Sequence, residues 1–106
     1  MFTVSIPTTI ELYRTDRTHF APINISTRWV FSIQASVDHY CKPQENLEAE
    51  EYTHFEVLII DYNTAFEDFD PVEIFPESFL QYWDGSVFQN VPVKDIQAMI
   101  DFVSKK

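Results

Sequence analysis

Alternation of apolar and polar residues over residues 23–37 constrains the fold more than any other feature of this sequence. Because successive side chains of a β-strand point to opposite faces, a period of two predicts a strand with one buried face. A strand of this length exceeds the usual length of about 5 or 6 residues. We therefore expect a bend, a bulge, or one arm of an extended hairpin. The odd positions carry Ile23, Ile25, Thr27, Trp29, Phe31, Ile33, Ala35 and Val37.

Two further segments show the same period. Even positions of residues 2–12 are mostly apolar, and Pro7 either makes this segment an edge strand or divides it in two. Residues 52–62 form the third predicted strand, and its second half is apolar on both faces, which predicts burial of both. The polar residues 42–51 are expected to form a hairpin loop with room for a short helical turn.

The last third of the chain mixes loop, turn and helix signals. Residues 63–78 have no clear period and predict an ordered loop with a helical turn. The Asp84-Gly85 pair predicts a hairpin between residues 79–82 and 87–91.

The C-terminal segment predicts a helix, because Ile96, Met99, Ile100 and Val103 recur at helical spacing. Strands joined by tight hairpins and followed by a helix predict an α+β fold. We expect a mostly antiparallel β-sheet with a long central hairpin and one C-terminal α-helix packed on it.

Length and composition predict one folded domain. The chain has 106 residues, and we expect residues 1–106 to form a single domain. Aromatic residues make up 16% and Gly occurs once, which excludes disordered and collagen-like classes. Cys41 is the single cysteine, so no internal disulfide can form. The chain start lacks signal-peptide features and no apolar stretch approaches about 20 residues, so we expect a cytoplasmic protein.

The net charge is −10, from 17 acidic and 7 basic residues. This balance argues against direct binding to nucleic acid or to a membrane, because both need cationic patches. A basic protein, or a nucleoprotein complex with a basic nucleic-acid-binding surface, is the complementary partner.

The negative charge is also segregated, since residues 43–93 contain no Lys or Arg. A solvated surface that maintains solubility explains many acidic runs. We favour a recognition face, because self-repulsion within one region opposes folding. The aromatic residues Phe66, Phe69 and Phe75 either anchor this region to the core, the commoner role, or form the apolar centre of an interface. The candidate partner-binding residues are Glu45, Glu48, Glu50, Glu51, Phe66, Glu67, Asp68, Phe69, Asp70, Glu73 and Glu77.

Motifs for catalysis and cofactors are missing from the sequence. A single Gly excludes glycine-rich phosphate loops, nucleophile elbows and dinucleotide fingerprints. His19, His39 and His54 have no partners at the spacing of a compact metal motif. Residues 67–70 lack the spaced oxygen ligands of a calcium loop. We expect no enzyme activity, no metal and no cofactor.

Three stretches resemble short uncharacterised proteins of bacteriophages and prophages: residues 40–48 (YCKPQENLE), 51–57 (EYTHFEV) and 91–96 (VPVKDI). This resemblance implies no activity and no site residues. Small size, acidity and the lack of a catalytic motif are similar to phage anti-defence inhibitors, including anti-CRISPR proteins, several of which mimic nucleic acid. The resemblance implies a location in the cytoplasm of a bacterial host cell.

The leading hypothesis is a non-enzymatic acidic protein that covers the basic nucleic-acid-binding surface of a host defence complex. One alternative is a phage structural or assembly protein that forms a homo-oligomer through the long strand of residues 23–37. An immunity protein or antitoxin against a basic toxin would use the same physics as the leading hypothesis. A small metal-dependent enzyme is a further alternative.

Overall fold

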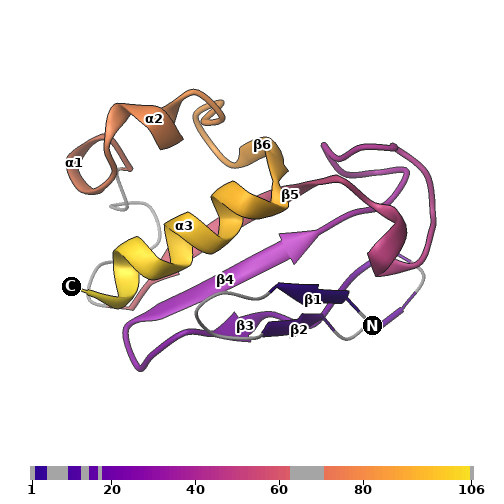
Figure 1. Ribbon diagram of the computed structural model, residues 1–106, viewed down its shortest axis with the longest axis horizontal. Coiled ribbons are helices and arrows are strands. Elements are labelled where there is room, and N and C mark those ends of the chain that lie inside the picture. The colour runs from indigo at the N-terminus through magenta and orange to yellow at the C-terminus, as the bar shows by residue number, and fades with distance from the viewer. Residues whose placement is uncertain (1, 5–9, 13–14, 17, 63–70, 106) are drawn as a thin grey trace.

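The computed structural model describes residues 2–4, 10–12, 15–16, 18–62 and 71–105. It has the predicted α+β arrangement of an antiparallel sheet with a C-terminal helix (Figure 1). The elements in chain order are β1 (Phe2–Val4), β2 (Ile10–Leu12), β3 (Ile23–Asn24), β4 (Trp29–Gln34), the 3-10 turn η1 (Ala49–Glu51), β5 (His54–Asp61), α1 (Pro71–Ile74), α2 (Glu77–Leu80), β6 (Phe88–Pro92) and α3 (Val93–Ser104).

The main sheet has the strand order β3-β4-β5-β6, and every neighbouring pair is antiparallel. Strands β1 and β2 pair with each other and form a separate hairpin, so the division of residues 2–12 around Pro7 is confirmed. Helix α3 lies across one face of the main sheet (Figure 1).

The hydrophobic core lies between α3 and that face. In β4 and β5 the odd residues are buried, and Phe31 pairs with Ile59 while Ile33 pairs with Val57. The predicted apolar stripe of α3 is confirmed, because its four residues are at most 3% exposed. The stripe consists of Ile96, Met99, Ile100 and Val103.

The prediction of one long strand over residues 23–37 is wrong. The chain turns back between β3 and β4, so that Ile23 pairs with Phe31. The Ser26 hydroxyl accepts hydrogen bonds from the backbone N–H groups of Arg28 and Trp29 and holds this turn. Because odd residues face the core on both sides of the turn, the period of two continues through it. The long exposed strand on which the assembly hypothesis rested is not formed.

Two details of the other strands also differ from expectation. Strand β5 forms as predicted, but burial of both faces of its second half is wrong, since Leu58 and Tyr62 are exposed. Residues 79–82 do not form a strand; residues 79 and 80 belong to α2 instead.

The turn at Asp84 and Gly85 is confirmed. Gly85 has a φ of +106°, which favours glycine. The Asp84 carboxylate accepts hydrogen bonds from the backbone N–H groups of Val87 and Ser86, and these lower the pKa of Asp84 to about 2. A side-chain carboxylate therefore closes the turn that leads into β6.

An aromatic cluster attaches α1 and α2 to the rest of the fold. Phe75 is 4% exposed, and its ring lies 5.7 Å from Phe79, 5.8 Å from Phe88 and 5.6 Å from Phe102 between centroids. The core role for Phe75 is therefore confirmed. Phe66 and Phe69 lie outside the described residues.

Several backbone groups next to the strands and in β6 form hydrogen bonds with other parts of the chain. The side-chain amide of Gln34 accepts a hydrogen bond from Phe20 N–H at 2.7 Å and donates one to Phe20 C=O at 2.8 Å. At β6, the N–H of Gln89 donates to Tyr82 C=O and the N–H of Asn90 donates to Tyr40 C=O.

Candidate binding surface

The connection from β4 to β5, residues 35–53, is folded against itself by side-chain to backbone hydrogen bonds. Asn46 Oδ1 accepts a bond from Val37 N–H at 3.0 Å, and Gln44 Nε2 donates to Val37 C=O at 3.2 Å. The buried Tyr52 hydroxyl donates to Glu45 C=O and accepts from Leu47 N–H. This connection therefore has a defined shape.

Two apolar side chains of this connection face solvent. Val37 and Tyr40 are each 50% exposed. The backbone of Tyr40 is fixed on both sides, since its N–H donates to Glu56 Oε2 at 2.8 Å and its C=O accepts from Asn90 N–H at 3.0 Å. A large exposed ring on a fixed backbone can contact a partner without the cost of ordering a loop.

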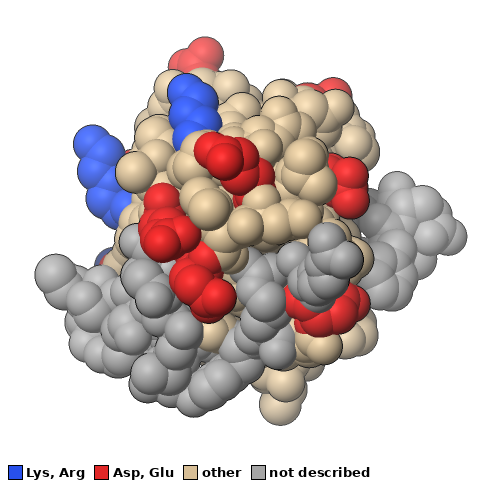
Figure 2. All heavy atoms as spheres, turned by 90° about the vertical axis from the view of Figure 1, so that its right-hand side faces the viewer, with Lys and Arg blue, Asp and Glu red and all other residues tan. Residues whose placement is uncertain are grey.

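Exposed carboxylates lie in the same connection as these apolar residues. Across the parts of the chain that the structure describes, none of the exposed acids here forms a salt bridge. Lys42 is also exposed in this connection. We call the following set the acidic end: Val37, Asp38, Tyr40, Glu45, Glu48 and Glu51. Figure 2 views the molecule from the side where the connection lies in Figure 1, and carboxylates are spread over it.

The structure brings together only part of the predicted binding residues. Glu45, Glu48 and Glu51 are exposed in the connection, and Glu50 lies in η1. Glu73 lies in α1, and Glu77 is the exposed first residue of α2. Figure 1 places η1 and the α1–α2 region at opposite ends of the long axis, so these two groups do not form one continuous face. The remaining predicted residues, Phe66, Glu67, Asp68, Phe69 and Asp70, lie outside the described residues.

One acid of the Lys- and Arg-free window is structural. Asp61 is 3% exposed and accepts hydrogen bonds from Arg28 Nε at 2.9 Å and Arg28 Nη2 at 3.0 Å. These hydrogen bonds from the guanidinium to Asp61 raise the pKa of Arg28. This two-point contact is the strong geometry for an Arg and a carboxylate, so Asp61 is not available to a partner.

Ser36 with His39, and the Cys41 thiol, resemble catalytic groups but make structural contacts. Ser36 Oγ lies 2.6 Å from His39 Nδ1, but Ser36 is fully buried and inaccessible to a substrate. Burial raises the pKa of the Cys41 thiol, and its S–H donates to Ser36 C=O. Within residues 2–4, 10–12, 15–16, 18–62 and 71–105, no group of three or more His, Cys, Asp or Glu side chains is arranged to hold a metal ion.

The sequence did not point to the apolar part of this surface. Alternation places Val37 at the end of the predicted long strand, and Tyr40 belongs only to one of the stretches that resemble phage proteins. The available signal is Tyr40 itself, an aromatic residue in a polar connection, because such a residue either anchors the connection, as Tyr52 does, or projects from it.

The fold and this surface define a small α+β protein with an acidic, partly apolar end. Comparisons with protein family models, with curated proteins and with solved structures found no match to this chain. No helix in the described part of the chain is long and apolar enough to cross a membrane.

Proposed function

We propose that this protein is a non-enzymatic binding protein whose acidic end covers a basic, nucleic-acid-binding surface of a partner protein. One observation carries the proposal: the exposed Val37 and Tyr40 lie in the same hydrogen-bonded connection as several exposed carboxylates. Among the residues that the structure describes, these carboxylates form no salt bridge. An apolar centre with a charged rim is the usual composition of a specific protein interface.

Electrostatics supports the choice of a basic partner. The protein carries a net charge of −10, and Glu45 and Glu48 are exposed and form no salt bridge with the residues that the structure describes. Complementary charge accelerates association, and it makes binding sensitive to salt. The phage-like stretches of the sequence make a host defence complex the first partner class to test.

Affinity capture from a bacterial lysate at low salt tests this proposal. The expected result is recovery of a basic nucleic-acid-binding protein that is released as the salt concentration rises. Recovery of acidic or neutral proteins, with no release by salt, would contradict it.

Reversal of two charges at the acidic end locates the surface. The variant Glu45→Lys/Glu48→Lys is expected to weaken binding to the captured partner by roughly tenfold or more, because each lost pair contributes up to about 1 kcal/mol and each new pair repels. The matched control is Glu73→Lys/Glu77→Lys, which changes net charge equally at the opposite end. Titration calorimetry measures both. Equal weakening by the two variants would mean that net charge alone governs binding.

Removal of the Tyr40 ring tests the apolar centre. Tyr40→Ala is expected to weaken binding by about tenfold, because central aromatic anchors contribute more than about 1 kcal/mol. The salt dependence of the affinity should stay unchanged. Tyr62→Ala is the matched control, since Tyr62 is also exposed but lies at the end of β5. A larger loss for Tyr62→Ala would place the interface elsewhere.

A further inference from the structure

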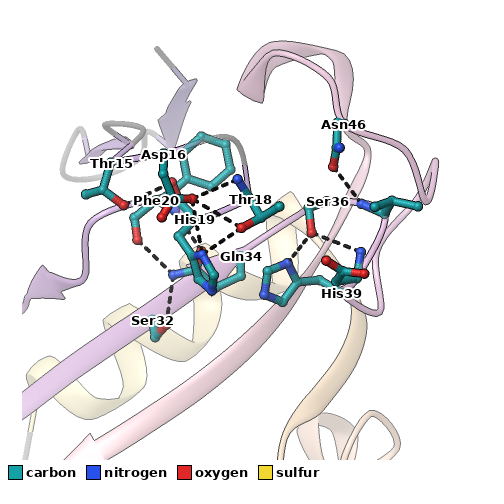
Figure 3. Close-up of polar contacts among 12 residues, drawn as sticks. Thr15, Asp16, Thr18, His19, Phe20, Ser32, Gln34, Ser36, His39 and Asn46 are labelled. Carbon is teal, nitrogen blue, oxygen red and sulfur yellow. Dashed lines mark hydrogen bonds and ion pairs between the residues drawn. The ribbon is translucent and has the colours of Figure 1, made fainter.

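Two histidine rings meet beside the acidic end. His19, in the segment before β3, and His39, in the β4–β5 connection, have ring centroids 5.3 Å apart and planes at 85° (Figure 3). The Nδ1 atom of His19 lies 3.2 Å from Asp16 Oδ1. The Nδ1 atom of His39 lies 2.6 Å from Ser36 Oγ. Each ring is thus held through Nδ1, and together they join two segments that are distant in the sequence.

The buried Ser36 hydroxyl determines the protonation state of His39 that fits this structure. Ser36 Oγ accepts a hydrogen bond from Asp38 N–H at 3.0 Å. Among the residues that the structure describes, the hydrogen of this hydroxyl has one acceptor, the Nδ1 atom of His39. A hydroxyl donates to Nδ1 only when that nitrogen carries no hydrogen. The arrangement therefore fits a neutral His39 ring with its hydrogen on Nε2.

Protonation of His39 disrupts this arrangement. The new Nδ1–H group needs Ser36 Oγ as its acceptor, so the hydroxyl hydrogen loses its own acceptor. Because Ser36 is fully buried, water cannot replace that acceptor without opening the turn. The neighbouring His19 ring also disfavours a positive charge on His39.

We infer that Ser36, His39 and His19 form a proton-sensitive latch that holds the turn of residues 36–40 in its binding shape at neutral pH and releases it when His39 is protonated. The effect on binding rests on the proposed function, because Val37 and Tyr40 of this turn belong to the acidic end. The latch itself is a property of the free protein and is measured without a partner.

The charged groups around His39 set the direction of this response. Burial lowers the pKa of His39, the Glu56 carboxylate of β5 opposes that effect, His19 adds to the lowering, and Asp38 on the same turn opposes it. Asp16 faces the other histidine, His19. With a lowered pKa, the folded protein binds this proton less readily than the unfolded chain. The stabilisation by the latch is complete above the ordinary histidine value of about 6.5 and is lost as pH falls through the lowered pKa.

An NMR titration of the free protein from about pH 7.5 to about pH 5 tests the latch. We expect the ¹⁵N shifts of the His39 ring to show hydrogen on Nε2 at the upper end of the range. The backbone amides of Asp38, His39 and Tyr40 should shift together with the protonation of His39. Protonation of His39 with no change at the Asp38 amide would overturn the inference.

The variant His39→Asn keeps a hydrogen-bond acceptor near Ser36 but does not titrate. The amide shifts of residues 38–40 should disappear in this variant and persist in His54→Asn, which removes a titrating ring from β5. Persistence of the shifts in His39→Asn would contradict the latch.

Binding of an oligo-arginine peptide at both ends of the pH range separates the latch from the proposed function. Weaker binding at low pH in the wild type, with a smaller change in His39→Asn, supports both. Equal pH dependence in the two proteins overturns the coupling of the latch to binding and leaves the proposed function standing. No binding at either pH contradicts the proposed function, while the amide shifts still decide the latch.

Discussion

Phe75→Ala is expected to lower the free energy of unfolding by about 3–5 kcal/mol, the usual cost of removing a buried Phe side chain. The Phe75 ring contacts Phe79 of α2, Phe88 of β6 and Phe102 of α3. Its loss leaves a cavity where these elements meet. Since a domain of this size is stabilised by only about 5–15 kcal/mol, much of its stability would be lost.

Urea unfolding followed by far-ultraviolet circular dichroism measures this effect. Phe75→Leu is the control, because it keeps most of the buried volume and should cost much less. An unchanged urea midpoint for Phe75→Ala would mean that α1 and α2 are attached to the fold by other contacts.

Tyr52→Phe is expected to lower the free energy of unfolding by about 1–3 kcal/mol, because the buried hydroxyl makes two hydrogen bonds to the backbone. It donates to Glu45 C=O and accepts from Leu47 N–H at 2.7 Å. These bonds shape the part of the connection that carries the acidic end. We therefore expect faster amide hydrogen exchange at residues 44–48 in this variant, together with weaker partner binding.

The same substitution at Tyr62, an exposed tyrosine, is the control for Tyr52→Phe. Tyr62→Phe should leave both stability and hydrogen exchange near the wild-type values. If Tyr52→Phe also leaves hydrogen exchange at residues 44–48 unchanged, the shape of the connection depends on its other bonds, such as the one from Val37 N–H to Asn46.

The sequence predicted the elements whose period is unambiguous. Helix α3 buries the four apolar residues expected from helical spacing, and β5 buries Phe55, Val57 and Ile59 on the face expected from alternation. Neither pattern predicts the burial of the polar residues Gln97 and Asp61. The prediction of one long strand over residues 23–37 was wrong because odd residues face the core both before and after the turn held by Ser26. The turn therefore leaves the alternation of apolar and polar residues unbroken. Alternation reports which face a residue lies on, but it does not report chain direction.

The binding surface was predicted only in part, for a different physical reason. Exposure of Glu45 and Glu48 follows from their charge, and a polar connection is recognisable in sequence. The separation of these residues from Glu77 depends on where the sheet places each connection. The contact between His19 and His39 likewise arises from the packing of two loops, and no local spacing encodes it.

Hydrogen bonds to backbone groups near the edges of the sheet affect how readily copies of this protein aggregate. Its side-chain amide engages both backbone groups of Phe20, much as a neighbouring strand would. On the far side of the sheet, the carbonyls of Tyr40 and Tyr82 occupy N–H groups of β6. Unpaired strand edges are the usual template for aggregation between chains. With these two N–H groups already bonded, another chain has fewer backbone donors to pair with along β6.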